Sequence, residues 1–176
     1  MTVNEYLSEL NSRYKTGIST EHSYRSDLQV LIKSIVPDVM VTNEPTRVAC
    51  GAPDYIITKK NVPVGYIEAK DIGKSLDSND YKEQFDRYRT SLTNLIITDY
   101  LEFRLYREST FVLSVTIGEI SGNKIIPKPE QFEAFTNLIQ DFCIYVSQTI
   151  KSASKLSKMM AGKARLMSGI IEKALK

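Results

Sequence analysis

Histidine and cysteine are scarce in this chain, and their scarcity argues against several classes of enzyme. Of the 176 residues one is a histidine, His22, and two are cysteines, Cys50 and Cys143. The histidine has no serine or cysteine nucleophile at a motif spacing, which argues against a catalytic triad and favours a simple helix-start residue. The cysteines match neither a disulfide framework nor a zinc site, so we interpret them as buried thiols of a reducing compartment.

Long hydrophobic runs and nucleotide-binding loops are also missing. No charged leader precedes an apolar run, no apolar stretch approaches the length that crosses a bilayer, and no phosphate-binding loop is present. The chain is 42% hydrophobic, which is enough for one core. We therefore expect a cytoplasmic protein with one domain in residues 1–150 and an appendage in residues 151–176.

Positive charge is concentrated toward the end of the sequence. Residues 151–176 hold seven of the 23 Lys and Arg residues and one of the 21 acids, Glu172, which leaves 16 basic and 20 acidic residues in positions 1–150. A mildly acidic body offers no broad surface for nucleic acid, so any such contact must be local. Residues 154–175 carry an apolar helical stripe and a basic face, which fits either packing on the chain's own sheet or a connector to another domain.

Hydrophobic periodicity predicts helices that alternate with short strands. Residues 21–36 have apolar side chains at helical spacing between a Thr20 N-cap and Pro37, and residues 78–92 and 130–150 also show helical patterns. Short segments rich in β-branched and aromatic residues predict strands at 39–42, 54–58, 64–70, 94–98, 102–107 and 111–117. The predicted order is a helix, three strands, a helix and further strands.

The stretch GAPDYIITKKNVPVGYIEAK, residues 51–70, contains three charged side chains that a hairpin would bring together. Alternation places Glu68 and Lys70 on the same face of their strand. A three-residue loop at 60–62 pairs residues whose numbers sum to 122 and sets Asp54 opposite Glu68, whereas a sum of 121 would send Asp54 to the other face. The first register predicts two carboxylates and an ammonium at one point.

Two carboxylates at cross-strand distance repel unless a cation lies between them. Hard oxygen ligands suit Mg²⁺, which keeps several waters for substrate phosphates, and Mn²⁺ could substitute for it. With a lysine that orients a water, these groups suffice for metal-assisted hydrolysis of a phosphodiester. The alternative is that Glu68 and Lys70 are an ordinary surface pair and that Asp54, after Pro53, is a turn residue.

Three further residues could join this site. Glu21 continues the apolar stripe of its helix and should point toward the sheet edge, although it could instead complement the helix dipole or pair with Arg25. Gln84 and Tyr88 lie four residues apart and share a helical face. Plain amphipathic packing would explain Tyr88 well and Gln84 less well.

Taken together, these residues resemble the PD-(D/E)xK nuclease superfamily. Pro53-Asp54 is followed by Glu68-Ala69-Lys70, and Gln84-Phe85-Asp86-Arg87-Tyr88 is similar to the QxxxY motif of RecB-like nucleases. The stretches TEHSYRSDLQ, GAPDYIITKKNVPVGYIEAKDIGKSL and TNLIITDYLEFRLYR resemble more narrowly the N-terminal nuclease domain of type IIG-like fused restriction-modification enzymes. The resemblance covers about residues 15–175.

The resemblance implies a fold and a set of metal ligands. The fold is a restriction-endonuclease-like α/β (α+β) core, in which a mixed central β-sheet is flanked by helices in αβββαβ order and C-terminal helices follow. Asp54, Glu68 and the backbone carbonyl of Ala69 would bind Mg²⁺. Glu21 would be a water-mediated or second-metal ligand.

The resemblance also implies roles for the other residues and for partners. Lys70 would position the attacking water, while Gln84 and Tyr88 would support the site or touch the DNA backbone. Methyltransferase and target-recognition domains lie downstream in such enzymes, and the basic segment 151–176 would begin the connector to them. We therefore expect this chain alone to bind double-stranded DNA weakly and without sequence preference.

Two functions from different classes are consistent with the sequence. The favoured one is a metal-dependent DNA endonuclease, and the rival is a nucleic-acid-binding or assembly module that uses the same fold without catalysis. Under either, five basic residues could contact phosphates or be solvated surface: Lys59, Lys60, Lys74, Arg87 and Arg89.

Overall fold

The computed structural model describes residues 1–45, 50–145 and 160, and Met1–Tyr145 form one compact unit. Within the described residues the chain forms four α-helices: α1 (Val3–Tyr14), α2 (Glu21–Ile35), α3 (Asn79–Ser91) and α4 (Phe132–Ile144). A 3-10 turn, Pro129–Gln131, leads into α4. None of these helices is long and apolar enough to cross a membrane.

The centre of this unit is a six-stranded sheet in the order β1-β2-β3-β4-β5-β6. Its strands are β1 (Met40–Asn43), β2 (Tyr55–Lys59), β3 (Val62–Ala69), β4 (Asn94–Thr98), β5 (Glu102–Arg107) and β6 (Thr110–Thr116). Strands β3 and β4 are parallel and the other neighbours are antiparallel. A parallel pair needs a crossover connection, and α3 lies in it.

The predicted fold class, a mixed sheet flanked by helices, is confirmed, since α2, β1, β2, β3, α3 and β4 follow one another in the expected αβββαβ order. Helix α2 begins after Thr20 and ends before Pro37, as the sequence pattern indicates. The predicted helix at 130–150 is observed as α4, and its part beyond Tyr145 lies outside the described residues. The predicted helix at 154–175 and its role as a connector also lie outside them, apart from Met160.

Two elements were not predicted. Helix α1 is stabilised by a capping box, in which the Thr2 hydroxyl accepts from the Glu5 N–H and the Glu5 carboxylate accepts from the Thr2 N–H. Its buried face presents Leu7 and Leu10 to the core. The second element is a separate hairpin of β7 (Gly118–Ser121) and β8 (Lys124–Pro127), and α1 contacts its second strand.

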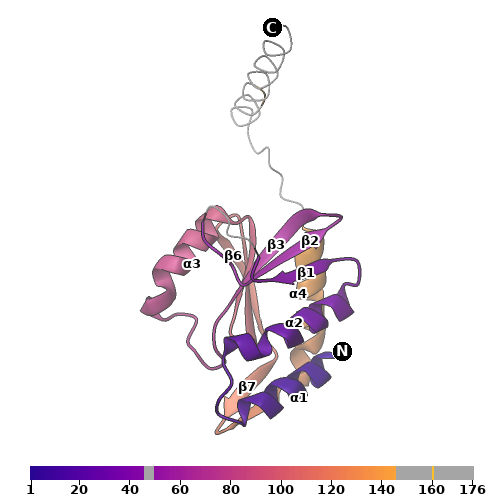
Figure 1. Ribbon diagram of the computed structural model, residues 1–176, viewed down its shortest axis with the longest axis vertical. Coiled ribbons are helices and arrows are strands. Elements are labelled where there is room, and N and C mark those ends of the chain that lie inside the picture. Colours follow the sequence, from indigo (N-terminus) through magenta and orange to yellow (C-terminus); the bar gives the residue numbers. More distant parts are fainter. Residues whose placement is uncertain (46–49, 146–159, 161–176) are drawn as a thin grey trace. The chain divides into compact units, whose positions relative to one another are not determined.

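The two faces of the sheet are covered unequally. In Figure 1, α1, α2 and α4 lie on one side of the sheet and α3 lies on the other. The first side holds the larger cluster of buried apolar residues, which includes Leu28, Ile57, Phe103 and Phe135. The smaller cluster, on the α3 side, consists of Cys50, Leu76, Phe85, Tyr88, Leu92, Leu95, Ile97 and Tyr106. Both cysteines are buried and free, as predicted.

The register of the β2–β3 hairpin agrees with the predicted one near the site, but the predicted three-residue loop is wrong. Tyr55 pairs with Ile67, which is the register that extends to place Asp54 opposite Glu68. The loop has two residues, Lys60 and Asn61, because both take the left-handed conformation (φ 50° and 63°) of a tight hairpin turn. Next to the turn the pairing is therefore shifted by one residue from the predicted register, with Lys59 opposite Val62. A bulge between the two halves of the hairpin, where Val64 is skipped, restores the expected register.

Candidate active site

Glu68, Lys70 and Gln84 form a closed group of hydrogen bonds on the α3 side of the sheet. Glu68 Oε1 accepts from Lys70 Nζ at 2.8 Å and from Gln84 Nε2 at 2.7 Å. Lys70 Nζ also donates to Gln84 Oε1 at 3.0 Å. Strand alternation aligns the first two side chains, and α3 brings the amide over them. The Glu-x-Lys pair is thus joined to the first residue of the QxxxY pattern.

Asp54 lies immediately before β2 and is fixed against the end of β3. Its Oδ2 accepts the Ala69 backbone N–H at 2.8 Å, and its Oδ1 accepts from Nη2 of Arg25. The residue beside Glu68 in the chain therefore also anchors the second carboxylate. This contact follows from the register, because residue 54 extends the pairing of Tyr55 with Ile67.

The electrostatics of Glu68 and Lys70 differ from those of surface residues. Burial, followed by the negative charge of Asp54, raises the pKa of Glu68 to about 7, while Lys70 opposes the rise. For Lys70, burial disfavours the charged form, but the carboxylates of Glu68 and Asp54 outweigh it, and the pKa is raised overall. Lys70 therefore remains an ammonium and acts as a hydrogen-bond donor.

The Lys70 ammonium also faces two aromatic rings of α3. Its Nζ lies 5.0 Å from the ring centre of Tyr81 and 5.8 Å from that of Phe85. Both distances are within the range of a cation–π contact. Helix α3 thus contributes an amide and two rings to the surroundings of the ammonium, which restricts where its third proton can point.

Arg25 is a central residue of this site, although the sequence indicated it only as a possible ion-pair partner of Glu21. It is 7% exposed. Its Nη1 donates to Glu44 at 2.5 Å and its Nη2 donates to Glu21 at 3.2 Å and to Asp54. The Glu21 carboxylate therefore reaches the site through Arg25, four residues later on the same helical face.

Asp71 and Tyr100 hold the first turn of α2 in place, and neither was singled out from the sequence. The Asp71 carboxylate accepts the Glu21 backbone N–H, and the Tyr100 hydroxyl donates to the Glu21 carbonyl at 2.8 Å. Asp71 directly follows Lys70, and Tyr100 lies two residues after β4. The ends of the parallel strands β3 and β4 thus position the helix that carries Arg25.

Tyr88, like Glu68 and Ala69, is almost fully buried. It is 2% exposed within the smaller cluster. A Cβ added to Gly51 would lie 2.9 Å from the Tyr88 hydroxyl oxygen, so the backbone just before Asp54 packs closely on this ring. Tyr88 therefore packs against the segment that leads into Asp54, and the expectation that it supports the site or touches the DNA backbone stays a prediction.

Several of the basic residues near the site are engaged within the chain. Lys59 pairs with Asp38 at 2.7 Å, Arg87 donates from Nε to the Cys50 carbonyl at 2.8 Å, and Arg89 pairs with Asp86. Contacts of these three with phosphate would require them to leave or share these partners.

One oxygen of this site lacks a partner. Glu68 is 3% exposed, and its Oε2 is buried without a hydrogen bond. A buried carboxylate oxygen is normally satisfied by a donor, a water or a cation. Among the described residues no three His, Cys, Asp or Glu side chains gather to hold a metal by themselves. Two carboxylates and the Ala69 carbonyl instead suit a cation that keeps several waters, which fits Mg²⁺.

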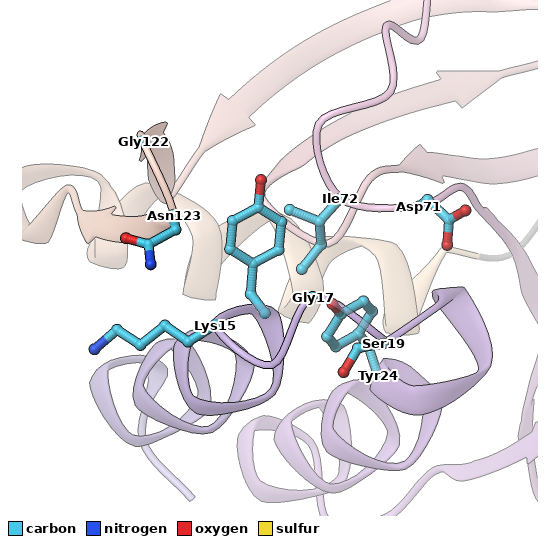
Figure 2. A pocket seen from close by; sticks show the side chains of 9 residues that line it. Lys15, Gly17, Ser19, Tyr24, Asp71, Ile72, Gly122 and Asn123 are labelled. Atoms are coloured by element: carbon cyan, nitrogen blue, oxygen red, sulfur yellow. The ribbon is translucent and has the colours of Figure 1, made fainter.

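A cavity of about 380 Å³ lies beside the start of α2, next to this site and not within it. Its lining includes Tyr24, Asp71, Lys15 and Asn123. In the view of Figure 2, Lys15 and Asn123 lie on the side of the hollow away from Asp71. The cavity shares Asp71 with the support of α2, whereas Asp54, Glu68 and Lys70 do not line it.

Comparison with known proteins shows the fold. The chain matches no protein-family model and no curated protein. Among solved structures it is similar to a chain in the cryo-EM structure of a DrdV–DNA complex, with a TM-score of 0.64 and 20% sequence identity. The match covers 84% of this chain and 14% of that chain, so this chain spans a small part of the length of its neighbour. The similarity agrees with the predicted restriction-endonuclease-like core.

Proposed function

We propose that this chain is a metal-dependent DNA nuclease domain in which Asp54, Glu68 and Lys70 carry the hydrolysis of a phosphodiester bond. The observation that carries the proposal is the buried Glu68 carboxylate. One of its oxygens is held by Lys70 and Gln84, and the other has no partner. A protein that did not use this carboxylate would gain by replacing it with an apolar side chain.

Mg²⁺, for which Mn²⁺ could substitute, would be held by Asp54, Glu68 and the Ala69 carbonyl, and it would polarise the phosphoryl group and lower the pKa of a bound water. Lys70 donates hydrogen bonds and stays protonated, so its part is to orient the attacking water and to stabilise negative charge on the phosphate oxygens. Gln84 holds both Glu68 and Lys70 in place. Hydrolysis forms a bond from the water oxygen to phosphorus and breaks one phosphorus–oxygen bond to the sugar.

The state of Glu68 without a cation supports this assignment. A pKa of about 7 leaves the carboxyl partly protonated at neutral pH. A cation beside it would favour the ionised form, because opposite charges lower the pKa of an acid. The residue thus ionises most completely when it has a cation to bind.

The wider context is also a proposal. The similar DrdV chain is in complex with DNA and is far longer than this one. We infer that this domain acts as the cleavage domain of a longer restriction-modification enzyme, in which methyltransferase and target-recognition domains select the DNA. Alone it would bind double-stranded DNA weakly, with an affinity that falls as salt is added.

Plasmid nicking in Mg²⁺ at low salt tests the proposal. We expect nicking by the native chain and a loss of about 100-fold or more for Lys70→Ala, as found when a transition-state donor is removed. Asp54→Asn should lose at least as much, because it removes the charge of a proposed metal ligand. Lys124→Ala is the control, because Lys124 is an exposed lysine on β8, an element that contributes no residue to the site. Equal nicking by the native chain and Lys70→Ala would contradict the assignment. DNA binding without any cleavage, also in the longer protein, would favour a non-catalytic module.

A further inference from the structure

Arg25 lies between helix α2 and the candidate active site, and its guanidinium contacts three carboxylates. It reaches Glu44 through Nη1, and Glu21 and Asp54 through Nη2. The side chain of Arg25 is 9% exposed and that of Asp54 is 12% exposed. A guanidinium does not lose its proton in proteins, so this is a fixed positive charge inside the site.

Both oxygens of Asp54 are engaged in this arrangement. Oδ2 accepts the Ala69 N–H, and Oδ1 accepts from Arg25. An oxygen can accept a second partner, but a divalent cation on Oδ1 would lie beside the guanidinium, and charges of one sign repel strongly at such short range. The cation and Arg25 therefore compete for the same oxygen.

Arg25 has other acceptors at hand if it gives up Asp54. Glu21 lies on the same helix, and Glu44 keeps a backbone link to Asp54 through its N–H, which donates to the Asp54 carbonyl at 2.8 Å. The Glu44 side chain is 70% exposed and can follow a shift of the guanidinium. The charge of Arg25 would remain paired after Asp54 is released.

We propose that Arg25 is a positioning residue that occupies Oδ1 of Asp54 while the metal site is empty and yields this oxygen when a divalent cation binds, remaining with Glu21 and Glu44. The inference rests on the proposed function, because it requires Asp54 to be a metal ligand. It implies that, while the metal site is empty, the guanidinium offsets the electrostatic repulsion between the Asp54 and Glu68 carboxylates. It also implies that Arg25 sets how weakly the domain binds a cation.

Binding of Mn²⁺, followed by the electron paramagnetic resonance signal of the free ion, tests the competition directly. We expect Arg25→Gln to bind Mn²⁺ about tenfold more tightly than the native chain, because the competing charge is gone. In EDTA the same variant should unfold at a lower temperature than the native chain. Saturating Mn²⁺ should then raise the unfolding temperature of the variant by more than it raises that of the native chain. A merely structural residue would not tighten metal binding when it is removed.

Arg13→Gln is the control for loss of an arginine–carboxylate pair that lies outside the site, although the Arg13 side chain, on α1, is 43% exposed. Arg13 pairs with Asp27 at 2.9 Å, and the Asp27 side chain is 9% exposed, but this pair belongs to the contact between α1 and α2. We expect Arg13→Gln to lower the unfolding temperature equally with and without Mn²⁺. Its Mn²⁺ affinity should equal that of the native chain.

Crystal structures of the native chain grown in EDTA and in Mn²⁺ provide a second test that needs no variant to fold. The hydrogen bond from Arg25 to Asp54 should be present without the ion and absent with it, while the contact to Glu44 persists. Mn²⁺ bound to Asp54 with the Arg25 hydrogen bond to Oδ1 retained would overturn the inference. So would an Arg25→Gln variant that binds Mn²⁺ no more tightly than the native chain.

The two proposals fail in distinguishable ways. If neither the native chain nor Arg25→Gln binds Mn²⁺, the metal site itself is wrong and both proposals fall. If the native chain binds Mn²⁺ and Asp54→Asn abolishes that binding, but Arg25→Gln leaves it unchanged, the proposed function stands. In that case only the competition is refuted.

Discussion

The two faces of the six-stranded sheet differ in what they bury. On the side of α1, α2 and α4, strand β3 contributes Ile67 and Ala69 to the larger apolar cluster. On the α3 side the alternate residues Glu68 and Lys70 are charged, and Tyr66 packs on the edge of the smaller cluster. Successive residues at the end of β3 therefore alternate in role: Ile67 and Ala69 pack in the apolar core, and Glu68 and Lys70 form the site.

The difference shows how a small domain can hold the buried carboxylate of Glu68 close to that of Asp54. Burial of Glu68 raises its pKa, which means that the ionised carboxylate is unfavourable where it lies. The larger cluster on the opposite face fixes the backbone of β3, so the side chains of the site need not find their own positions. Rigid elements of this kind orient functional groups better than loops do. We expect the larger cluster to determine stability and the α3 side to determine activity.

Truncating a buried phenylalanine on each face gives the largest expected effects and tests this division. Phe103 is 0% exposed and its ring centre lies 4.7 Å from that of Phe135. Phe103→Ala should cost about 4–5 kcal/mol of unfolding free energy, because the packed surroundings cannot close the cavity. Phe85→Ala, on the α3 side, should cost about 3 kcal/mol, since water can enter beside α3. Urea unfolding measures both.

The same pair of variants separates stability from activity. Lys70 lies over the Phe85 ring, so Phe85→Ala should also impair nicking at a temperature where the variant remains folded. Phe103→Ala should keep its activity per folded molecule. An equal or larger loss of stability for Phe85→Ala would show that the smaller cluster carries as much of the fold as the larger one.

The pH dependence of stability provides the second test, through Glu68. The pKa of Glu68 is raised to about 7 in the folded chain, from an ordinary value of 4.5. The folded state therefore binds the proton more tightly than the unfolded state, so this group stabilises the fold at low pH. That contribution falls as pH rises from about 4.5 to about 7 and is lost above it. At 1.36 kcal/mol for each pKa unit, the total is about 3 kcal/mol.

Glu68→Gln should remove this dependence. We expect the native chain in EDTA to lose more unfolding free energy than the variant between pH 5 and pH 8, by about 2–3 kcal/mol. Urea unfolding at the two pH values measures the difference, and the variant controls for every other titrating group. Parallel losses in both proteins would show that Glu68 is already ionised at pH 5 and that its burial costs little.

The larger cluster is packed so closely around Gly65 that it leaves no room for a methyl group at this position. A Cβ on Gly65 would lie 2.4 Å from Phe142 Cζ and 2.9 Å from Asn94 Nδ2. Gly65→Ala should cost about 1–3 kcal/mol, because the helix carrying Phe142 must move. The double variant Gly65→Ala with Phe142→Leu should be less destabilised than the sum of the two single variants. Additive costs would show that the contact is relieved in another way.

The parts of the fold that the sequence predicted are those governed by local periodicity. Strand alternation placed Glu68 beside Lys70, and the register that opposes Asp54 to Glu68 was predicted as one of two alternatives. The predicted loop was wrong because Lys60 and Asn61 adopt a tight turn, and the bulge at Val64 then compensates. A bulge changes the pairing without changing the hydrophobic pattern, so periodicity cannot locate it.

The missed parts depend on contacts between distant segments. Arg25 was noted only as a partner of Glu21, because nothing local indicates that it also reaches Asp54, 29 positions later. Asp71 and Tyr100 act on the first turn of α2 from the ends of two strands. Their roles become visible only when β3 and β4 lie side by side. Helix α1 is different, since the Thr2 capping box is a local signal that could have been recognised.

The smallest expected effect comes from the cap of α3, and it distinguishes the two faces most finely. Ser78 Oγ accepts the Asp80 N–H at 3.2 Å, so Ser78→Ala should cost about 1 kcal/mol. Thr2→Ala removes the matched cap of α1 at a similar cost. Because α3 packs on the smaller cluster, hydrogen exchange in its first turn should accelerate more in Ser78→Ala than exchange in the first turn of α1 does in Thr2→Ala. Equal acceleration would mean that the first turn of α3 is held as firmly as that of α1, and that the two faces do not differ in this respect.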